Sequence, residues 1–169
     1  MRDRSAGGVE IRLQAGAPGA SGRALGFDCP QNILLAWQPS EKRHTSKYID
    51  DEKWQNKITL AGQKAVNNLK SDSWGHSQWS AILKQSRIFA EQSNLLDEPE
   101  RKHLLGIVRE IVRELDLQAK VSIRLCMLGV SLAILPRDLS KPLSKEELDL
   151  ISKELDKLEI GYKSTKISG

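Results

Sequence analysis

The sequence predicts an all-α fold, a small bundle of four or five helices with a disordered N-terminal tail. Two observations lead to this fold class. Apolar residues recur at steps of three and four through most of the chain after residue 48, which is the spacing of amphipathic helices. The first 26 residues are rich in glycine and lack a sustained apolar period, so burial would not offset the entropy cost of ordering them.

This pattern divides the chain into three regions. We expect residues 1–47 to be mostly disordered or loosely docked, with the short apolar stretch 31–37 (QNILLAW) as the part that docks. Residues 48–160 are expected to form the helical bundle, and residues 161–169 a frayed C-terminus. The folded part is therefore expected to be much smaller than the whole chain.

The first part of the bundle is expected to hold three helices, over about 50–69, 77–93 and 98–115. In the first helix, Trp54 and Ile58 belong to one apolar stripe, and Asp50 can cap the start. In the third, Asp97 and Glu100 have the spacing of a capping box, in which a side chain bonds the backbone N–H three residues ahead.

The segment 118–135 allows two interpretations. Polar and apolar residues alternate over 120–125, which is typical of a half-buried strand. At 100° per residue the same segment has two apolar faces, which is typical of a central helix. No other segment offers an evident strand partner, and a lone strand leaves backbone groups unsatisfied. We therefore predict a helix that ends before Pro136, with a strand as the alternative.

The last helix has the clearest start signal in the chain. Ser144 and Glu147 form a capping box, and Leu143 with Leu148 supplies the matching hydrophobic staple. Gly161 is a natural terminator for this helix. These residues predict a helix that begins at 144 and ends before 161.

Charge and composition exclude several classes of protein. The formal net charge of +4 comes from the two ends of the chain, because residues 49–117 carry ten basic and eleven acidic side chains. No apolar run reaches the roughly 18–20 residues of a membrane-spanning helix. Two cysteines are too few for a disulfide scaffold or a cysteine-based metal site. We therefore expect no membrane span, no metal and no cofactor.

No residue stands in a recognisable catalytic context. The histidines His44, His76 and His103 lie in a polar linker, a turn and an amphipathic helix, and none adjoins a nucleophile motif. Cys126 lies in the most apolar segment, where a thiol behaves as a small hydrophobe. Phosphate-binding loops of the GxGxxG or GxxxxGK[ST] type are absent. The sequence therefore predicts a protein that is not an enzyme.

The candidate interaction residues are tryptophans and arginines. Trp54, Trp74 and Trp79 lie close together in the sequence, and tryptophan is favoured both in protein interfaces and in the core of a small bundle. It can also stack on nucleic-acid bases. Arg109 and Arg113, each followed by a glutamate, form either a solvated face or a charged edge for helix pairing.

The leading hypothesis is a non-catalytic helical adaptor or assembly subunit that acts through protein–protein interaction or self-association. The alternative is a nucleic-acid-binding accessory protein that uses its basic tails and tryptophans. A helical enzyme with an unfamiliar site is a third hypothesis. We expect an intracellular protein, cytoplasmic or nuclear, with a mitochondrial location as the alternative because of the arginines in the N-terminal segment.

Overall fold

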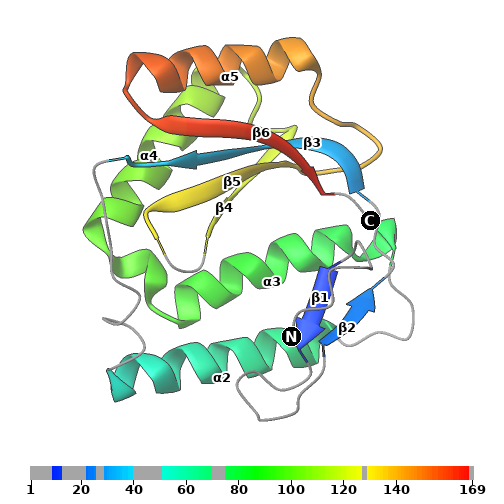
Figure 1. Cartoon of the computed structure of the whole chain (residues 1–169), viewed down its shortest axis with the longest axis vertical. Coiled ribbons are helices and arrows are strands. Elements are labelled where there is room, and N and C mark those ends of the chain that lie inside the picture. The colour runs from blue at the N-terminus through cyan, green and yellow to red at the C-terminus, as the bar shows by residue number, and fades with distance from the viewer. Residues whose placement is uncertain are drawn as a thin grey trace.

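The protein combines a four-stranded antiparallel sheet with α-helices, as seen in a computed structural model (Figure 1). The structure describes residues 9–12, 22–25, 29–39, 51–69, 75–126 and 129–167. The fold is therefore α/β, and the predicted all-α bundle is wrong.

The elements in chain order are β1 (Val9–Arg12), β2 (Gly22–Leu25), β3 (Cys29–Trp37), α2 (Glu52–Leu69), the short 3-10 helix η1 (His76–Gln78), α3 (Trp79–Gln92), the short 3-10 helix η2 (Leu95–Asp97), α4 (Pro99–Glu114), β4 (Val121–Leu125), β5 (Ser131–Pro136), α5 (Lys145–Lys157) and β6 (Gly161–Ile167).

The strands of the main sheet are arranged in the order β4-β5-β3-β6, so β3 and β5 are the inner strands. In the register, Leu34 of β3 lies opposite Ile134 of β5 and Ser164 of β6. From β3 through α4, β4, β5 and α5 to β6 the chain follows the β-α-β-β-α-β order of the ferredoxin-like arrangement, with α2 and α3 inserted after the first strand. β1 and β2 pair only with each other among the described residues.

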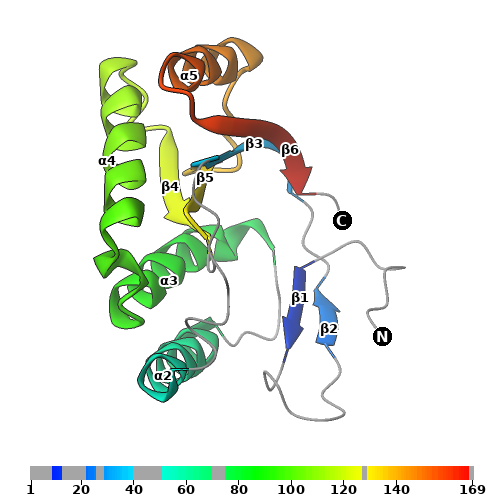
Figure 2. The ribbon, with the colours of Figure 1, turned by 60° about the vertical axis from the view of Figure 1, so that its left-hand side comes forward.

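Helices cover both faces of this sheet, as Figure 2 shows. On one face, Leu34 and Ile134 pack in a core cluster with residues of α4 and α5, such as Val108 and Ile151. On the other face, Ile33 packs in a second cluster with Trp79 and Leu83 of α3 and with Leu135 of β5. Side chains alternate between the faces of a strand, so a continuous apolar run in β3 serves both clusters.

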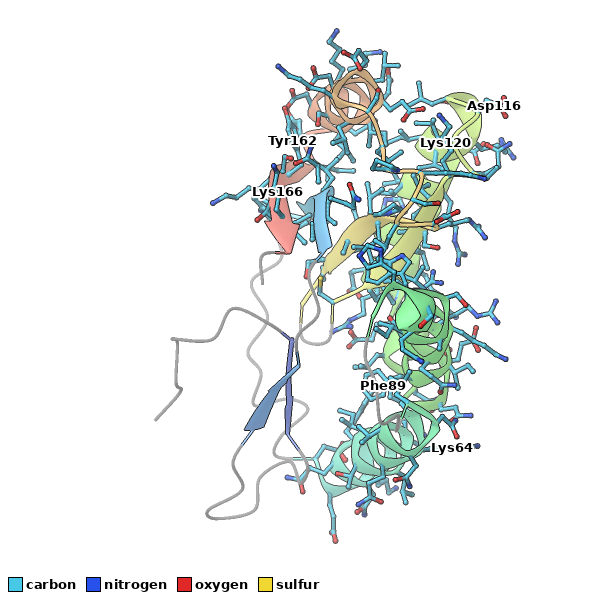
Figure 3. All side chains as sticks on the ribbon, turned by 90° about the vertical axis from the view of Figure 1, so that its right-hand side faces the viewer. Lys64, Phe89, Asp116, Lys120, Tyr162 and Lys166 are labelled. Carbon is cyan, nitrogen blue, oxygen red and sulfur yellow. The ribbon has the colours of Figure 1, made fainter. Side chains whose placement is uncertain are left out.

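Helix α2 is the outlying element, and it packs along α3. Phe89 lies between the two helices (Figure 3). An ideal Cβ at Gly62 of α2 would stand 3.8 Å from its ring. Lys64 projects from α2 into solvent in the same view. Among the described residues, every helix is too short or too polar to cross a lipid bilayer.

Several expectations about single elements need correction. The segment 118–135, predicted as one helix, contains the antiparallel strands β4 and β5, so the strand alternative describes it. Residues 161–167, expected to fray, form β6, and 29–37, placed in a disordered or loosely docked tail, form the inner strand β3. The predicted capping box of Ser144 and Glu147 is confirmed.

The indole of Trp37 lies over Gly161, its register partner across β3 and β6. An ideal Cβ at Gly161 would stand 2.5 Å from the Cε2 and Nε1 atoms of that ring, so alanine at this position displaces the indole.

We predict that Gly161→Ala lowers the free energy of unfolding by about 1–2 kcal/mol, measured by urea denaturation, because overpacking forces the ring to shift. In a Trp37→Leu background the same change should cost much less. Gly106→Ala is the matched control, since Gly106 is exposed in α4 with open space around it, and alanine there should stabilise the helix by roughly 0.5–1 kcal/mol. An equal loss of unfolding free energy from Gly161→Ala in both backgrounds would contradict the close contact between Trp37 and Gly161.

Candidate functional site

The end of β3, the start of β5 and the first turn of α4 meet at one end of the sheet. The backbone N–H of Gln38, directly after β3, donates to the carbonyl of Val130 at 3.0 Å. The Nη1 of Arg101, in the first turn of α4, donates to the carbonyl of Cys126, directly after β4, at 3.2 Å. Residues distant in the sequence therefore converge here.

A sharp turn between α3 and α4 shapes one wall of this region. Asn94 has a positive φ of 59°, in the left-handed region that asparagine tolerates better than most residues. Its Nδ2 donates to Oδ2 of Asp97 at 2.7 Å. Glu98 is extended and Pro99 opens α4, where its missing N–H costs nothing. Contrary to the predicted capping box, the helix start shows no side-chain cap.

The start of α2 forms the opposite wall. The Oδ1 atom of Asp51 accepts hydrogen bonds from the backbone N–H of Lys53 at 2.9 Å and of Trp54 at 3.2 Å. This cap fixes the first turn of α2. Lys53 and Lys57 are four residues apart, so they lie on the same side of the helix.

Between these walls lies a cleft of about 440 Å³, which we call the α4 cleft. Its lining residues are Asp51, Lys53, Trp54, Lys57, Asn94, Asp97, Glu98, Pro99 and Glu100. A second hollow of about 240 Å³ shares Pro99 and Glu100 with it and is also lined by Gln38 and His103. The volume of the α4 cleft is within the range of small-molecule sites, and that of the second hollow is below it.

Several carboxylates of the α4 cleft are already engaged. Asp51 caps α2, Asp97 accepts from Asn94 and lies 3.6 Å from Nζ of Lys102, and Glu98 pairs with Arg101. The ammonium groups of Lys53 and Lys57 have no ion pair within the part of the chain that the structure describes. These two lysines are therefore the cationic groups that the cleft offers to a ligand.

A buried ion pair supports the wall of the cleft. Nε of Arg101 lies 2.7 Å from Oε2 of Glu98, and the side chains are 0% and 8% exposed. A guanidinium in this position requires a charged partner because desolvation of an unpaired ion costs several kcal/mol. Arg101 also bonds the carbonyl of Cys126, so the pair fixes α4 relative to the end of β4.

Among the described residues, the structure does not bring the sequence-predicted interaction residues into one site. Trp54 is half-buried and lines the α4 cleft. Trp79 is buried in the core, where its Nε1 donates to the carbonyl of Pro136 at 2.7 Å. Arg109 and Arg113 are exposed on α4, and Arg113 pairs with Glu110. Trp74 lies outside the described residues, and the interaction roles of all five stay predictions.

Sequence reasoning did not identify Lys53, Lys57 and Asn94 as residues of the α4 cleft, or Gln38 as a residue of the second hollow. The two lysines carry a visible signal, because they follow a cap residue and share a helix side with a tryptophan. Asn94 and Gln38 carry none, since only the tertiary fold brings them close to the start of α4. Among the described residues, no group of three or more His, Cys, Asp or Glu side chains is placed to hold a metal ion.

Comparison with known proteins shows similarity at the level of solved structures. No protein-family model and no curated protein sequence matches the chain. A solved structure described as "Phosphotransferase related to CoA biosynthesis pathway" is similar, with a TM-score of 0.60 and 26% sequence identity over 96% of this chain. The match covers 46% of that protein, so the chain spans about half of its length.

This similarity overturns the functional predictions made from the sequence. The non-catalytic helical adaptor and the prediction that the protein is not an enzyme are contradicted by the phosphotransferase match, while nucleic-acid binding and a protein partner stay predictions. The physical reason for the error is that the site is assembled from chain segments that carry no recognisable local motif.

Removing one partner of the buried ion pair should strongly destabilise the fold. We predict that Arg101→Met lowers the free energy of unfolding by about 3–5 kcal/mol, because it leaves the carboxylate of Glu98 buried without its cation. The double variant Arg101→Met/Glu98→Met should lose clearly less than the sum of the single changes. Arg113→Met, which breaks an exposed pair with Glu110, is the control and should cost less than about 1 kcal/mol in urea denaturation. Similar losses for Arg101→Met and Arg113→Met would contradict the role of the buried pair.

Proposed function

We propose that this chain forms part of a phosphotransferase and that the α4 cleft binds a phosphoryl-bearing substrate. The observation that carries the proposal is the similarity to the phosphotransferase structure, which extends over 96% of this chain with a TM-score of 0.60. The cleft supports it independently, because its two lysines lack ion-pair partners among the described residues.

The chemistry of phosphoryl transfer requires mainly positioning and stabilisation of negative charge. Lys53 and Lys57 would supply positive charge from one side of the cleft. The N-terminal end of α4, which carries the positive end of the helix dipole, lies on the other side. The ion pair of Glu98 with Arg101 and the contacts of Asp97 with Asn94 and Lys102 reduce the repulsion that these carboxylates would exert on an anion.

We further propose that the matched region corresponds to one part of the phosphotransferase's catalytic unit. The similarity covers 46% of the phosphotransferase, so that protein has further parts with no counterpart in the match. The substrate would belong to CoA biosynthesis, the pathway to which the similar phosphotransferase is described as related. An intracellular location stays a prediction.

Pyrophosphate binding tests the cleft directly, measured by isothermal titration calorimetry on the full chain. We predict that Lys53→Ala/Lys57→Ala weakens binding by roughly tenfold, because two cations facing the ligand are lost. Lys64→Ala is the matched control, since Lys64 is an exposed lysine of the same helix outside the cleft, and it should leave binding unchanged. Circular dichroism should show that all variants retain their helices. Equal weakening by Lys64→Ala, or no binding by the unmodified chain, would count against the α4 cleft.

A further inference from the structure

Four arginines gather along the outer edge of the sheet, at β4. Arg124 belongs to β4, Arg87 to α3 and Arg109 to α4, while Arg137 directly follows β5. We call this set the arginine edge. β4 is an end strand of the sheet, and α3 and α4 both contact it, which brings the four side chains into one neighbourhood.

The centre of the arginine edge is the half-buried Arg124. Its Nε donates to the carbonyl of Leu83 in α3 at 2.8 Å, and its Nη1 donates to the carbonyl of Ile123 at 2.8 Å. Nε of Arg137 donates to the carbonyl of Val121, also at 2.8 Å. All three acceptors are neutral, so these bonds orient the guanidinium groups without neutralising them.

The positive charge at this edge is largely uncompensated. Burial, followed by repulsion from Arg87, Arg137 and Arg109, lowers the pKa of Arg124 from its ordinary value. Within the described residues, Arg87 has only a loose exposed pair with Glu91 at 3.8 Å, and Glu110 pairs with Arg113 rather than with Arg109. A negatively charged partner would therefore relieve repulsion that the folded chain alone retains.

The backbone groups of β4 that point away from β5 are a second feature of this edge. The N–H of Cys126 donates to the carbonyl of Ser131, and the N–H of Arg137 donates to the carbonyl of Lys120. Because hydrogen-bonded pairs alternate along an antiparallel ladder, the backbone groups of residues 121, 123 and 125 point away from β5. The backbone N–H and carbonyl of Val121 and the carbonyl of Ile123 already form hydrogen bonds within the chain. Among the described residues, the backbone N–H and carbonyl of Leu125 form no hydrogen bond, so this end of the edge can donate one main-chain hydrogen bond and accept another.

We propose that the arginine edge binds an acidic, extended segment of a partner protein. Carboxylates suit guanidinium groups, which can bind them through two parallel hydrogen bonds. β4 has five residues and spans roughly 17 Å, which matches a short peptide segment laid along the edge. Trp79, the tryptophan of α3, is buried, so it offers no stacking surface for nucleic-acid bases. The proposal goes beyond the phosphotransferase assignment and does not depend on the α4 cleft.

The test is the binding of a fluorescent ten-residue peptide with alternating Glu and Val to the full chain, measured by anisotropy at low salt. We expect binding that weakens by about threefold in Arg109→Gln and by roughly tenfold in Arg87→Gln/Arg109→Gln, and that disappears at high salt. Both arginines are exposed or carry only a loose pair, so these variants should fold normally.

Two control variants show whether the peptide binds at the arginine edge. Arg113→Gln changes an exposed arginine of the same helix that is paired with Glu110, and it should leave peptide binding unchanged. Lys53→Ala/Lys57→Ala should also leave it unchanged, which distinguishes failure here from failure of the α4 cleft. The proposal is overturned if the peptide does not bind at low salt, if a Gln-for-Glu peptide binds equally well, if Arg113→Gln weakens binding as much as Arg109→Gln, or if a single-stranded oligonucleotide of equal charge binds more tightly.

Discussion

The fold depends on the burial of β3 on both faces. Its successive apolar residues pack alternately against α4 and α5 on one side and against α3 on the other, while β5 and β6 take its backbone hydrogen bonds. A strand without side chains suited to both faces could not occupy this position, because one of the two helical layers would lose its contact surface. The end of β3 then places Gln38 at the second hollow, beside the start of α4.

The sequence predicts the helices well and the sheet poorly, for a physical reason. A helix satisfies its own backbone hydrogen bonds, so local periodicity and the capping box at Ser144 are enough to locate it. The strand QNILLAW needs partners, and these lie at residues 131–134 and 161–167, far along the chain. The alternation over 120–125 is a valid strand signal, but it is decisive only once these distant partners are known.

The same non-local assembly hides the candidate site from sequence reasoning. Helix capping alone accounts for the sequence positions of Asp97 and Glu100, but the structure shows Glu98 in a buried pair with Arg101 and no side-chain cap at the start of α4. Because several carboxylates are engaged within the fold, Lys53 and Lys57 of α2 are the groups on which the proposed ligand binding rests. Trp79, a candidate interface residue in the sequence, is buried in a core cluster. Residue type alone does not show whether a side chain belongs to the core, to an ion pair or to a binding site, because its burial and its ion-pair partners depend on the tertiary fold.

Phosphoryl binding in the α4 cleft is the property on which the proposed function depends. The most direct measurement is a titration of the ¹⁵N-labelled chain with pyrophosphate, followed by backbone amide chemical shifts. We predict saturable shifts at residues 53–57 and 94–103, from the two walls of the cleft, with little change along β4. Shifts confined to β4 and the neighbouring arginines, or no saturable shifts at all, would contradict binding in the cleft.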